Sequence, residues 1–264
     1  MRKKLLAALL CVAMTASLLI GCGSNEGTSG NKGGSSSEES EGALNIAIVS
    51  SPNGVDDGSF NEDNYNGILA YIKEHPDAKV TPIREETGVP ATVVERITEI
   101  AGSYDVVVCL GYQCAGIGQV AQDNPDVDFI LVDSYPTDAE GNTVELDNVY
   151  AMLFAEQESG FFAGMAAALE TKSGKVAVVN GQPFPSNVNY QYGFEAGVNY
   201  ANTKYGTTAE CVELSSYAGV YNNENIGGNY TGNFSDEATG KVIGEALINE
   251  GCVMSFVAAG ASGN

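Results

Sequence analysis

Basic residues are scarce in this 264-residue chain. Lysine and arginine together number 12 against 34 aspartates and glutamates, which gives a formal net charge of -22 at pH 7. A surface this acidic repels phosphate backbones and anionic lipid, so it argues against nucleic-acid binding and against a strongly anionic substrate. The charge balance favours a neutral or cationic small ligand.

Histidine and cysteine are also few. His75 is the only histidine and adjoins Pro76, so no Ser-His-Asp or Cys-His arrangement is supported. The cysteines after residue 22 match neither a small disulfide framework nor a zinc pattern, and we expect them to be free, buried thiols. They are Cys109, Cys114, Cys211 and Cys252. The sequence therefore predicts no enzyme, no metal site and no cofactor.

The chain has one long apolar run, and it lies at the N-terminus. Residues 2–4 are basic, residues 5–20 are almost all apolar or small, and Leu19-Ile20-Gly21-Cys22 closes the run. This layout is typical of a secretory signal and is short for a membrane-spanning helix. The ending resembles the lipobox of bacterial lipoproteins, which predicts a signal peptide over 1–21 and lipidation of Cys22. Ordinary secretion is the alternative. The polar residues that follow, within 22–43, predict a flexible tether.

From residue 44 onward, strand-like and helix-like segments alternate. The expected strands are 46–49, 79–83, 105–110, 129–132, 175–179, 209–214 and 253–258. The expected helices are 65–72, 90–101, 115–122, 159–169, 192–202 and 237–249. This alternation predicts an α/β fold in which parallel sheets carry helices on both faces.

We expect two doubly wound lobes, an N-terminal lobe over 44–148 and a C-terminal lobe over 149–264. The polar, glycine-rich stretch 219–233 is expected to be a surface loop. The last expected strand runs into a glycine-rich loop where a helix should follow, so we expect the C-terminal part of a longer protein to be missing here.

A polar loop after the first expected strand is the strongest candidate for a ligand site. It contains Asp56, Asp57, Phe60 and Asn61. In open α/β sheets, ligands bind beyond the carboxyl ends of the strands, where this loop would lie. Capping of the next helix by Ser59 or Asn61 is the alternative, although capping alone does not explain the two acids and the ring.

Two further residues follow buried strands. Asp133 ends the strand 129–132, and Phe184 follows the strand 175–179. Both would face the same crevice as the first loop. Asp133 could instead cap the following turn, and Phe184 could belong to a small satellite core.

One glycine motif has the form of a dinucleotide fingerprint. Gly116-Ile117-Gly118-Gln119-Val120-Ala121 reads G-x-G-x-x-A, but residues 111–115 separate it from the preceding strand. The fingerprint requires its glycines directly after the strand. We expect these glycines to let the helix pack close to the sheet.

Six segments in order along the folded part resemble the basic membrane protein (BMP) family of ABC-transporter substrate-binding lipoproteins, whose characterised members bind purine nucleosides. These segments are 56–61, 130–133, 156–164, 174–179, 192–197 and 258–264. The resemblance implies a two-lobed type I periplasmic-binding-protein fold that closes around its ligand.

The resemblance also implies roles for single residues. Phe60 is similar to the ring that stacks on the base, with Phe184 as its partner from the other lobe. Asn61 and Asp133 look like hydrogen-bonding partners of the base edge, Asp56 or Asp57 shapes the loop, and Gly260 resembles the position whose backbone passes the sugar. The residues that hold the ribose in this family would lie beyond residue 264.

The implied protein is a monomer, lipid-anchored on the extracytoplasmic face of a bacterial membrane, that delivers a nucleoside to a permease. Two other functions remain open. One is a lipoprotein sensor that signals occupancy by a small neutral or cationic solute to a membrane partner, and the other is a hydrolase that releases free base.

Overall fold

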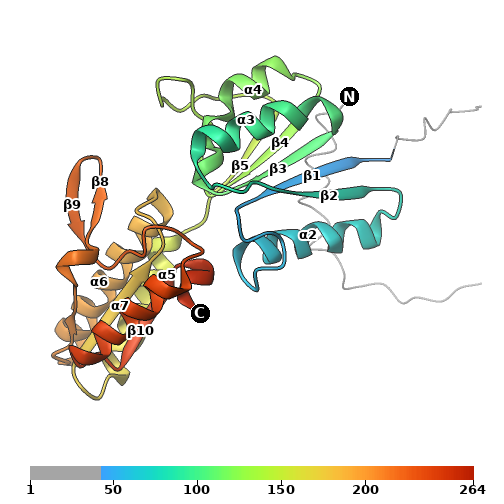
Figure 1. The fold of residues 1–264 in the computed structure, drawn as a ribbon. Coiled ribbons are helices and arrows are strands. Elements are labelled where there is room, and N and C mark those ends of the chain that lie inside the picture. The colour runs from blue at the N-terminus through green and yellow to red at the C-terminus, as the bar shows by residue number, and fades with distance from the viewer. Residues whose placement is uncertain (1–42) are drawn as a thin grey trace, which may run out of the picture. The chain divides into compact units, whose positions relative to one another are not determined.

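The computed structural model describes residues 43–264. The predicted signal peptide, Cys22 and nearly all of the predicted tether lie outside these residues. Within them the chain forms two separate parallel sheets, whose strands alternate with helices along the sequence (Figure 1). No helix in the described part is both long and apolar enough to cross a membrane.

The first sheet has five parallel strands in the order β2-β1-β3-β4-β5. Their bounds are β1 Asn45–Ser50, β2 Lys79–Arg84, β3 Val106–Leu110, β4 Asp128–Val132 and β5 Val149–Met152. Because β5 pairs with β4 from Phe129↔Val149 to Val132↔Met152, it belongs to this sheet. We therefore propose that the boundary between the lobes follows Met152 rather than residue 148.

Helices cover both faces of this sheet (Figure 1). The helices α3 (Pro90–Ile100) and α4 (Gly118–Asp123) pack on one face and α2 (Phe60–Glu74) on the other. Pro90 begins α3, where its missing N–H needs no helical partner. As the periodicity predicts, Val93 and Ile97 of α3 are buried.

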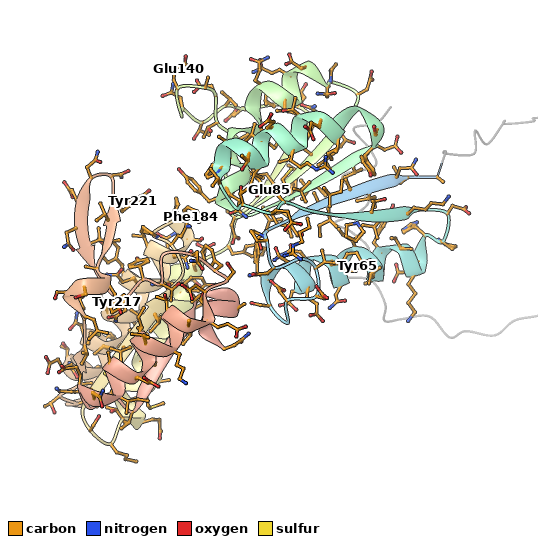
Figure 2. The ribbon with its side chains drawn as sticks, in the orientation of Figure 1. Tyr65, Glu85, Glu140, Phe184, Tyr217 and Tyr221 are labelled. Carbon is orange, nitrogen blue, oxygen red and sulfur yellow. The ribbon has the colours of Figure 1, made fainter. Side chains whose placement is uncertain are left out.

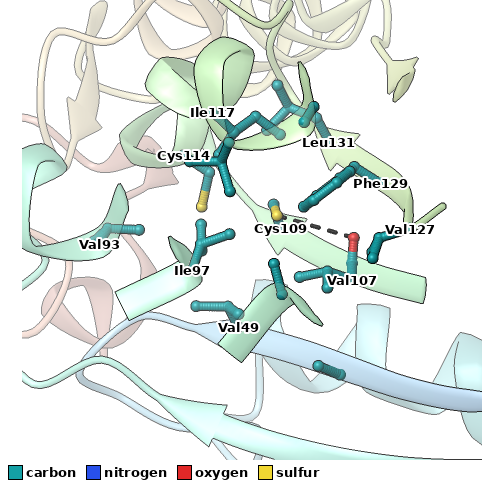
Figure 3. Close-up of a cluster of buried hydrophobic side chains, with 14 of the residues drawn as sticks. Val49, Val93, Ile97, Val107, Cys109, Cys114, Ile117, Val127, Phe129 and Leu131 are labelled. Carbon is teal, nitrogen blue, oxygen red and sulfur yellow. Dashed lines mark hydrogen bonds between the residues drawn. The ribbon is translucent and has the colours of Figure 1, made fainter. Parts of the chain in front are cut away.

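The core under α3 contains two of the cysteines. Cys109 on β3 and Cys114 in the 3₁₀ segment Tyr112–Ile117 are buried among Ile97, Phe129 and neighbouring aliphatic side chains (Figure 3). Cys109 Sγ lies 3.9 Å from the Val107 carbonyl oxygen. The hydrogen bond with Cys109 raises the pKa of the Cys114 thiol most, and burial raises it further.

All four described cysteines are free, and three of them are buried. The expectation of free thiols is confirmed. Cys211 is only partly buried, so burial was wrong for that residue.

The apolar face predicted for α2 is only partly buried. Tyr65 and Ile68 pack against the sheet core, but Leu69 is 40% exposed. The helical spacing of Tyr65, Ile68, Leu69 and Ile72 predicts that all four face the core, and this prediction is wrong for Leu69. Figure 2 shows Tyr65 on this helix.

The glycines of the G-x-G-x-x-A motif do permit close packing, but not against the sheet. A Cβ atom on Gly118 would lie 2.4 Å from the carbonyl oxygen of Thr137, in the segment after β4. The Gly118 amide donates to that same oxygen at 3.2 Å. The prediction that this motif packs its helix against the sheet was therefore wrong for Gly118.

The second sheet has three parallel strands in the order β10-β6-β7. These are β6 Lys175–Asn180, β7 Glu210–Cys211 and β10 Met254–Ala258. The helices α5 (Glu156–Glu170) and α6 (Pro185–Tyr205) pack on one face and α7 (Glu237–Asn249) on the other. The strand expected at 209–214 is shorter than predicted.

Part of the stretch 219–233 departs from the expected surface loop. It forms a hairpin of β8 (Gly219–Tyr221) and β9 (Glu224–Gly227), and Figure 2 shows Tyr221 on it. The chain then turns inward, and Asn229 is fully buried. Its amide nitrogen donates to the carbonyls of Val178 and Val212, both at 3.0 Å. Composition misled the prediction here because asparagine is common in turns but also pairs well with backbone groups at a strand end.

Candidate ligand-binding site

The loop after β1 is organised by Asp57. Its carboxylate accepts hydrogen bonds from the backbone amides of Ser59 at 3.0 Å, Asn61 at 3.3 Å and Glu62 at 3.0 Å. These are amides of the first turn of α2, which have no partner within the helix. The capping role that the sequence analysis considered for Ser59 or Asn61 belongs to Asp57, and Ser59 makes no side-chain cap. Asp57 thus shapes the loop.

Asn61 is buried with part of its hydrogen-bonding capacity unused. Its amide nitrogen donates to Ser51 Oγ and to Asp57 Oδ2, both at 2.8 Å. The residue is 2% exposed, and its Oδ1 has no hydrogen-bond partner within residues 43–264. The two hydrogen bonds that Nδ2 donates hold the side chain in one orientation, so Oδ1 is a positioned acceptor.

The two other predicted residues of this loop differ in exposure. Phe60 is partly buried and packs against the core of the first sheet, whereas Asp56 is exposed. Phe60 therefore has its ring fixed at the start of α2, and Asp56 remains in contact with solvent.

Asp133 follows β4 in a strained backbone conformation. Its φ is +63°, a left-handed value that is uncommon outside glycine, and its amide donates to the Met152 carbonyl at 2.8 Å. Burial, followed by the charge of Glu156, raises the pKa of the Asp133 carboxyl to about 6. The pKa of Tyr190 is also raised, by burial and then by the charges of Glu156 and Asp133. Glu156 begins α5 and Tyr190 lies on α6, so groups on two helices of the second lobe influence Asp133 or are influenced by it through their charges.

Phe184 lies between two rings that the sequence analysis missed. Its centroid is 5.1 Å from that of Tyr112 and 5.9 Å from that of Phe234, both in tilted geometry. These separations are typical of favourable aromatic pairs. The predicted pairing of Phe184 with Phe60 across a base is not tested, and in the described chain Phe184 packs on these two rings instead. Phe184 is labelled in Figure 2.

Tyr112 was recognisable in principle, since it directly follows the C-terminal end of β3. Phe234 carried no such signal because it lies in a polar segment far from any strand.

Phe234 is held from several sides. A Cβ atom on Gly181 would lie 2.2 Å from its ring, so the absence of a side chain there makes room for it. Gly260, with φ +55°, approaches the Phe234 carbonyl oxygen, which a Cβ atom would reach at 3.1 Å. Asn53 Nδ2, from the loop after β1, donates to the same carbonyl at 2.9 Å. Gly260, one of the predicted site residues, therefore lies beside Phe234, and its positive φ favours glycine at this position.

We call the following residues, which come after strands of both sheets, the rim: Asn61 and Phe60 after β1, Tyr112 after β3, Asp133 after β4, Phe184 after β6, and Gly260 after β10, with Phe234 packed on Phe184 and Gly260. The rim offers aromatic rings, one positioned acceptor and one acid of raised pKa. In the described part, no group of three His, Cys, Asp or Glu side chains is placed to hold a metal ion. This arrangement suits the binding of a flat, polar, uncharged molecule.

A hollow in the described part of the chain lies away from the rim. It has a volume of about 370 Å³ and is lined by Glu195, Glu210, Glu213 and Cys211 with neighbouring α6 residues. None of the predicted site residues lines it. Its walls are acidic and lack an aromatic ring, so the rim stays the candidate ligand site.

Comparison with solved structures supports the class of fold. An ABC transporter solute-binding protein from Aeropyrum pernix superposes with a TM-score of 0.69 at 24% identity, over 83% of this chain and 56% of that one. The transcription regulator CcpA of Lactococcus lactis superposes with a TM-score of 0.52 at 13% identity, over 81% of this chain and 68% of that one. The chain has the two-lobed α/β fold shared by type I periplasmic binding proteins and such regulators.

Sequence comparison gives the family. Residues 44–215 match the Bmp model, described as ABC transporter substrate-binding protein PnrA-like, and the chain belongs to that family. The nucleoside-binding protein BmpA of an ABC transporter from Lactococcus lactis is 27% identical over the whole chain, which covers 67% of its length. Basic membrane protein A of Borreliella burgdorferi is 26% identical over 79% of this chain and 54% of its own length. The chain thus spans between half and two thirds of these relatives.

The predicted family and fold class are confirmed. The family is one of substrate-binding proteins, in agreement with the prediction of no enzymatic activity.

Proposed function

We propose that this protein captures a nucleoside, most favourably a purine nucleoside, at the rim and delivers it to an ABC permease. The observation that carries the proposal is the combination of tilted, packed rings at Phe184 with the positioned acceptor of Asn61 and the acid of Asp133. The relative BmpA is named as nucleoside-binding, which supports the same ligand class.

Each group matches a part of the ligand. Phe60 and Phe234 stack on the base, each aromatic contact contributing about 0.5–1.5 kcal/mol beyond area burial. Asn61 Oδ1 and the Asp133 carboxylate accept hydrogen bonds from base N–H groups, and Gly260 lets the backbone approach the sugar. An analogue that leaves buried polar groups unpaired is rejected. Asp57 acts through the loop that it caps, and Asp56 forms the outer edge of that loop.

Transport follows from binding and release without chemistry. Closure of two lobes about a hinge traps the ligand in proteins of this fold class. We place the protein on the extracytoplasmic face of the membrane, held by lipid on Cys22 and acting as a monomer. This placement is a proposal supported by the lipobox-like sequence and by the family.

Calorimetric titration with inosine, guanosine, adenosine and uridine tests the proposal. We expect micromolar or tighter binding of a purine nucleoside, about -8 kcal/mol or better, lost in Phe60→Ala and Asp133→Ala. Exposed Asp56→Ala is the matched control and should retain most of the affinity. Heat from ribose or amino acids but from no nucleoside would refute the ligand class.

A sensor role is the second candidate. Deletion of the gene separates the two, because loss of nucleoside uptake supports delivery to a permease, whereas normal uptake with a lost transcriptional response supports sensing. Release of free base from a bound nucleoside would instead favour the hydrolase.

A further inference from the structure

Buried side-chain nitrogen and oxygen atoms without a hydrogen-bond partner are rare among residues 43–264, and two of the three lie on the last residue of a strand. They are Ser50 Oγ, Asn61 Oδ1 and Asn180 Nδ2. Ser50 is the last residue of β1, Asn180 is the last residue of β6, and Asn61 is in the first turn of α2. Protein interiors pair nearly all buried polar groups, so an unpaired group at a binding rim has a use that the ligand-free fold does not fulfil.

Asn180 is the member of this set that the proposed function leaves unassigned. It is fully buried, and its Oδ1 accepts a hydrogen bond from Asn187 Nδ2 at 3.3 Å. Asn187 Nδ2 also donates to the Ala258 carbonyl at 2.8 Å. The acceptor side of the Asn180 amide is therefore used, while its donor side is free.

The backbone of Asn180 is fixed on both sides. Its amide donates to the Asn229 carbonyl at 2.8 Å, and its carbonyl accepts from the Thr231 amide at 2.9 Å. The next residue, Gly181, lies directly under the ring of Phe234. Asn180 thus sits rigidly at the end of β6, one residue from the aromatic part of the rim.

Asn229 provides an internal comparison. It is also fully buried and adjoins Asn180, but its amide is fully used. It donates to two carbonyls, and its Oδ1 accepts from the Leu214 amide at 2.8 Å. Asn229 therefore uses its whole side-chain amide within the fold, whereas the Nδ2 donor of Asn180 has no partner among the described residues.

We propose that Asn180 is a specificity-determining residue, whose free Nδ2–H donates to an acceptor atom on the bound ligand. The inference rests on the proposed function and adds to it, since it requires a ring nitrogen or an oxo oxygen on the ligand opposite the end of β6. Because Asn180 is fully buried in this structure, the contact requires neighbouring side chains at the end of β6 to move aside.

Paired substitutions test this assignment. Asn180→Leu keeps the branched shape of the side chain and removes the amide, and Asn229→Leu does the same at the paired asparagine. Asn180→Leu should weaken purine nucleoside binding about tenfold or more. It should lower the Tm without ligand much less than Asn229→Leu does, because only the 3.3 Å bond accepted from Asn187 is lost and Asn187 keeps its bond to the Ala258 carbonyl. Asn229→Leu should lower the Tm and leave the affinity of the folded protein unchanged. Asn180→Ala serves if leucine prevents folding.

A series of deaza-purine nucleosides identifies the acceptor. The analogue that lacks the acceptor atom should bind the wild type and Asn180→Ala with the same affinity. The other analogues should bind Asn180→Ala more weakly than the wild type. Wild-type binding that Asn180→Leu and Asn180→Ala leave intact, or a Tm loss like that of Asn229→Leu, would overturn the role of Asn180 alone. Failure of the wild type to bind any nucleoside would overturn the proposed function and this inference together.

Discussion

At the scale of single residues, the proposed contact between Asp133 and the ligand predicts that binding depends on pH. The pKa of its carboxyl is raised to about 6 by burial and by the charge of Glu156. If the ionised carboxylate accepts a hydrogen bond from the ligand, protonation competes with binding. We expect the affinity for the nucleoside to be constant above about pH 7 and to fall as the pH drops below about 6. Calorimetry between pH 5 and pH 8 measures this, and a flat profile for the wild type would contradict it.

The same shift affects stability in the opposite direction. Because the folded pKa lies above the ordinary value of 3.8, the folded state binds the proton more tightly than the unfolded state. The unfavourable contribution of the charge is absent below the unfolded pKa, grows up to about pH 6 and is complete above it. Asp133→Asn should therefore raise the Tm at pH 7.5 and change it little at pH 4. Asparagine also tolerates positive φ, so the substitution adds no backbone strain.

Asp57 illustrates a residue whose role is structural. Its carboxylate caps the amides of Ser59, Asn61 and Glu62. Asp57→Ala should lower the free energy of unfolding by about 0.5–2 kcal/mol, as loss of an N-terminal cap does. Urea denaturation checks this, with Asp56→Ala as the control because Asp56 is exposed. Equal stability of the two variants would show that Asp57 does not stabilise the N-terminus of α2.

At the scale of elements, the crossing of α5 and α6 depends on glycine. A Cβ atom on Gly164 would lie 2.0 Å from the Phe194 carbonyl oxygen, and one on Gly197 would lie 2.0 Å from that of Phe161. The helices touch backbone to backbone, which any side chain would prevent.

Gly164→Ala should therefore destabilise the fold by about 1–3 kcal/mol, the usual cost of overpacking. Gly67→Ala on α2 is the matched control, since nothing lies within 4 Å of a Cβ atom there. It should be neutral or stabilising by up to about 1 kcal/mol, because alanine favours a helix. Thermal unfolding of both variants is the measurement, and an unaffected Gly164→Ala would refute the close crossing.

The elements also show what a sequence can predict. Buried strands such as β1, β3 and β6 are apolar between their end residues, and α3 has a clear apolar face, so pattern alone locates them. The pattern failed where tertiary contacts decide. Leu69 has helical spacing but remains exposed, and the polar segment around Asn229 is drawn inward by hydrogen bonds.

The candidate site divides in the same way. Strand ends are visible in sequence, which allowed Asp133 and Phe184 to be singled out, and the order of the strands brings Tyr112 to the same rim. Phe234 was missed because its position comes from packing on Gly181 and from the hydrogen bond with Asn53. Neither contact leaves a local signature in the sequence.

At the scale of the whole molecule, the net charge of -22 distinguishes ligand classes. A neutral nucleoside gains nothing from this charge, whereas a cationic solute would be attracted by it, and salt screens that attraction. We expect the nucleoside affinity to change less than about twofold between about 0.02 M and about 0.5 M salt. Titrations at both salt concentrations measure this, and a steep loss at high salt would favour a cationic ligand.

The most direct test of the rim as the binding site is a crystal structure of the protein with bound guanosine. We expect density for the base against Phe60 and Phe234, with its edge facing Asn61 and Asp133. Density in the acidic hollow beside Glu195, or elsewhere with the rim unchanged, would contradict the account.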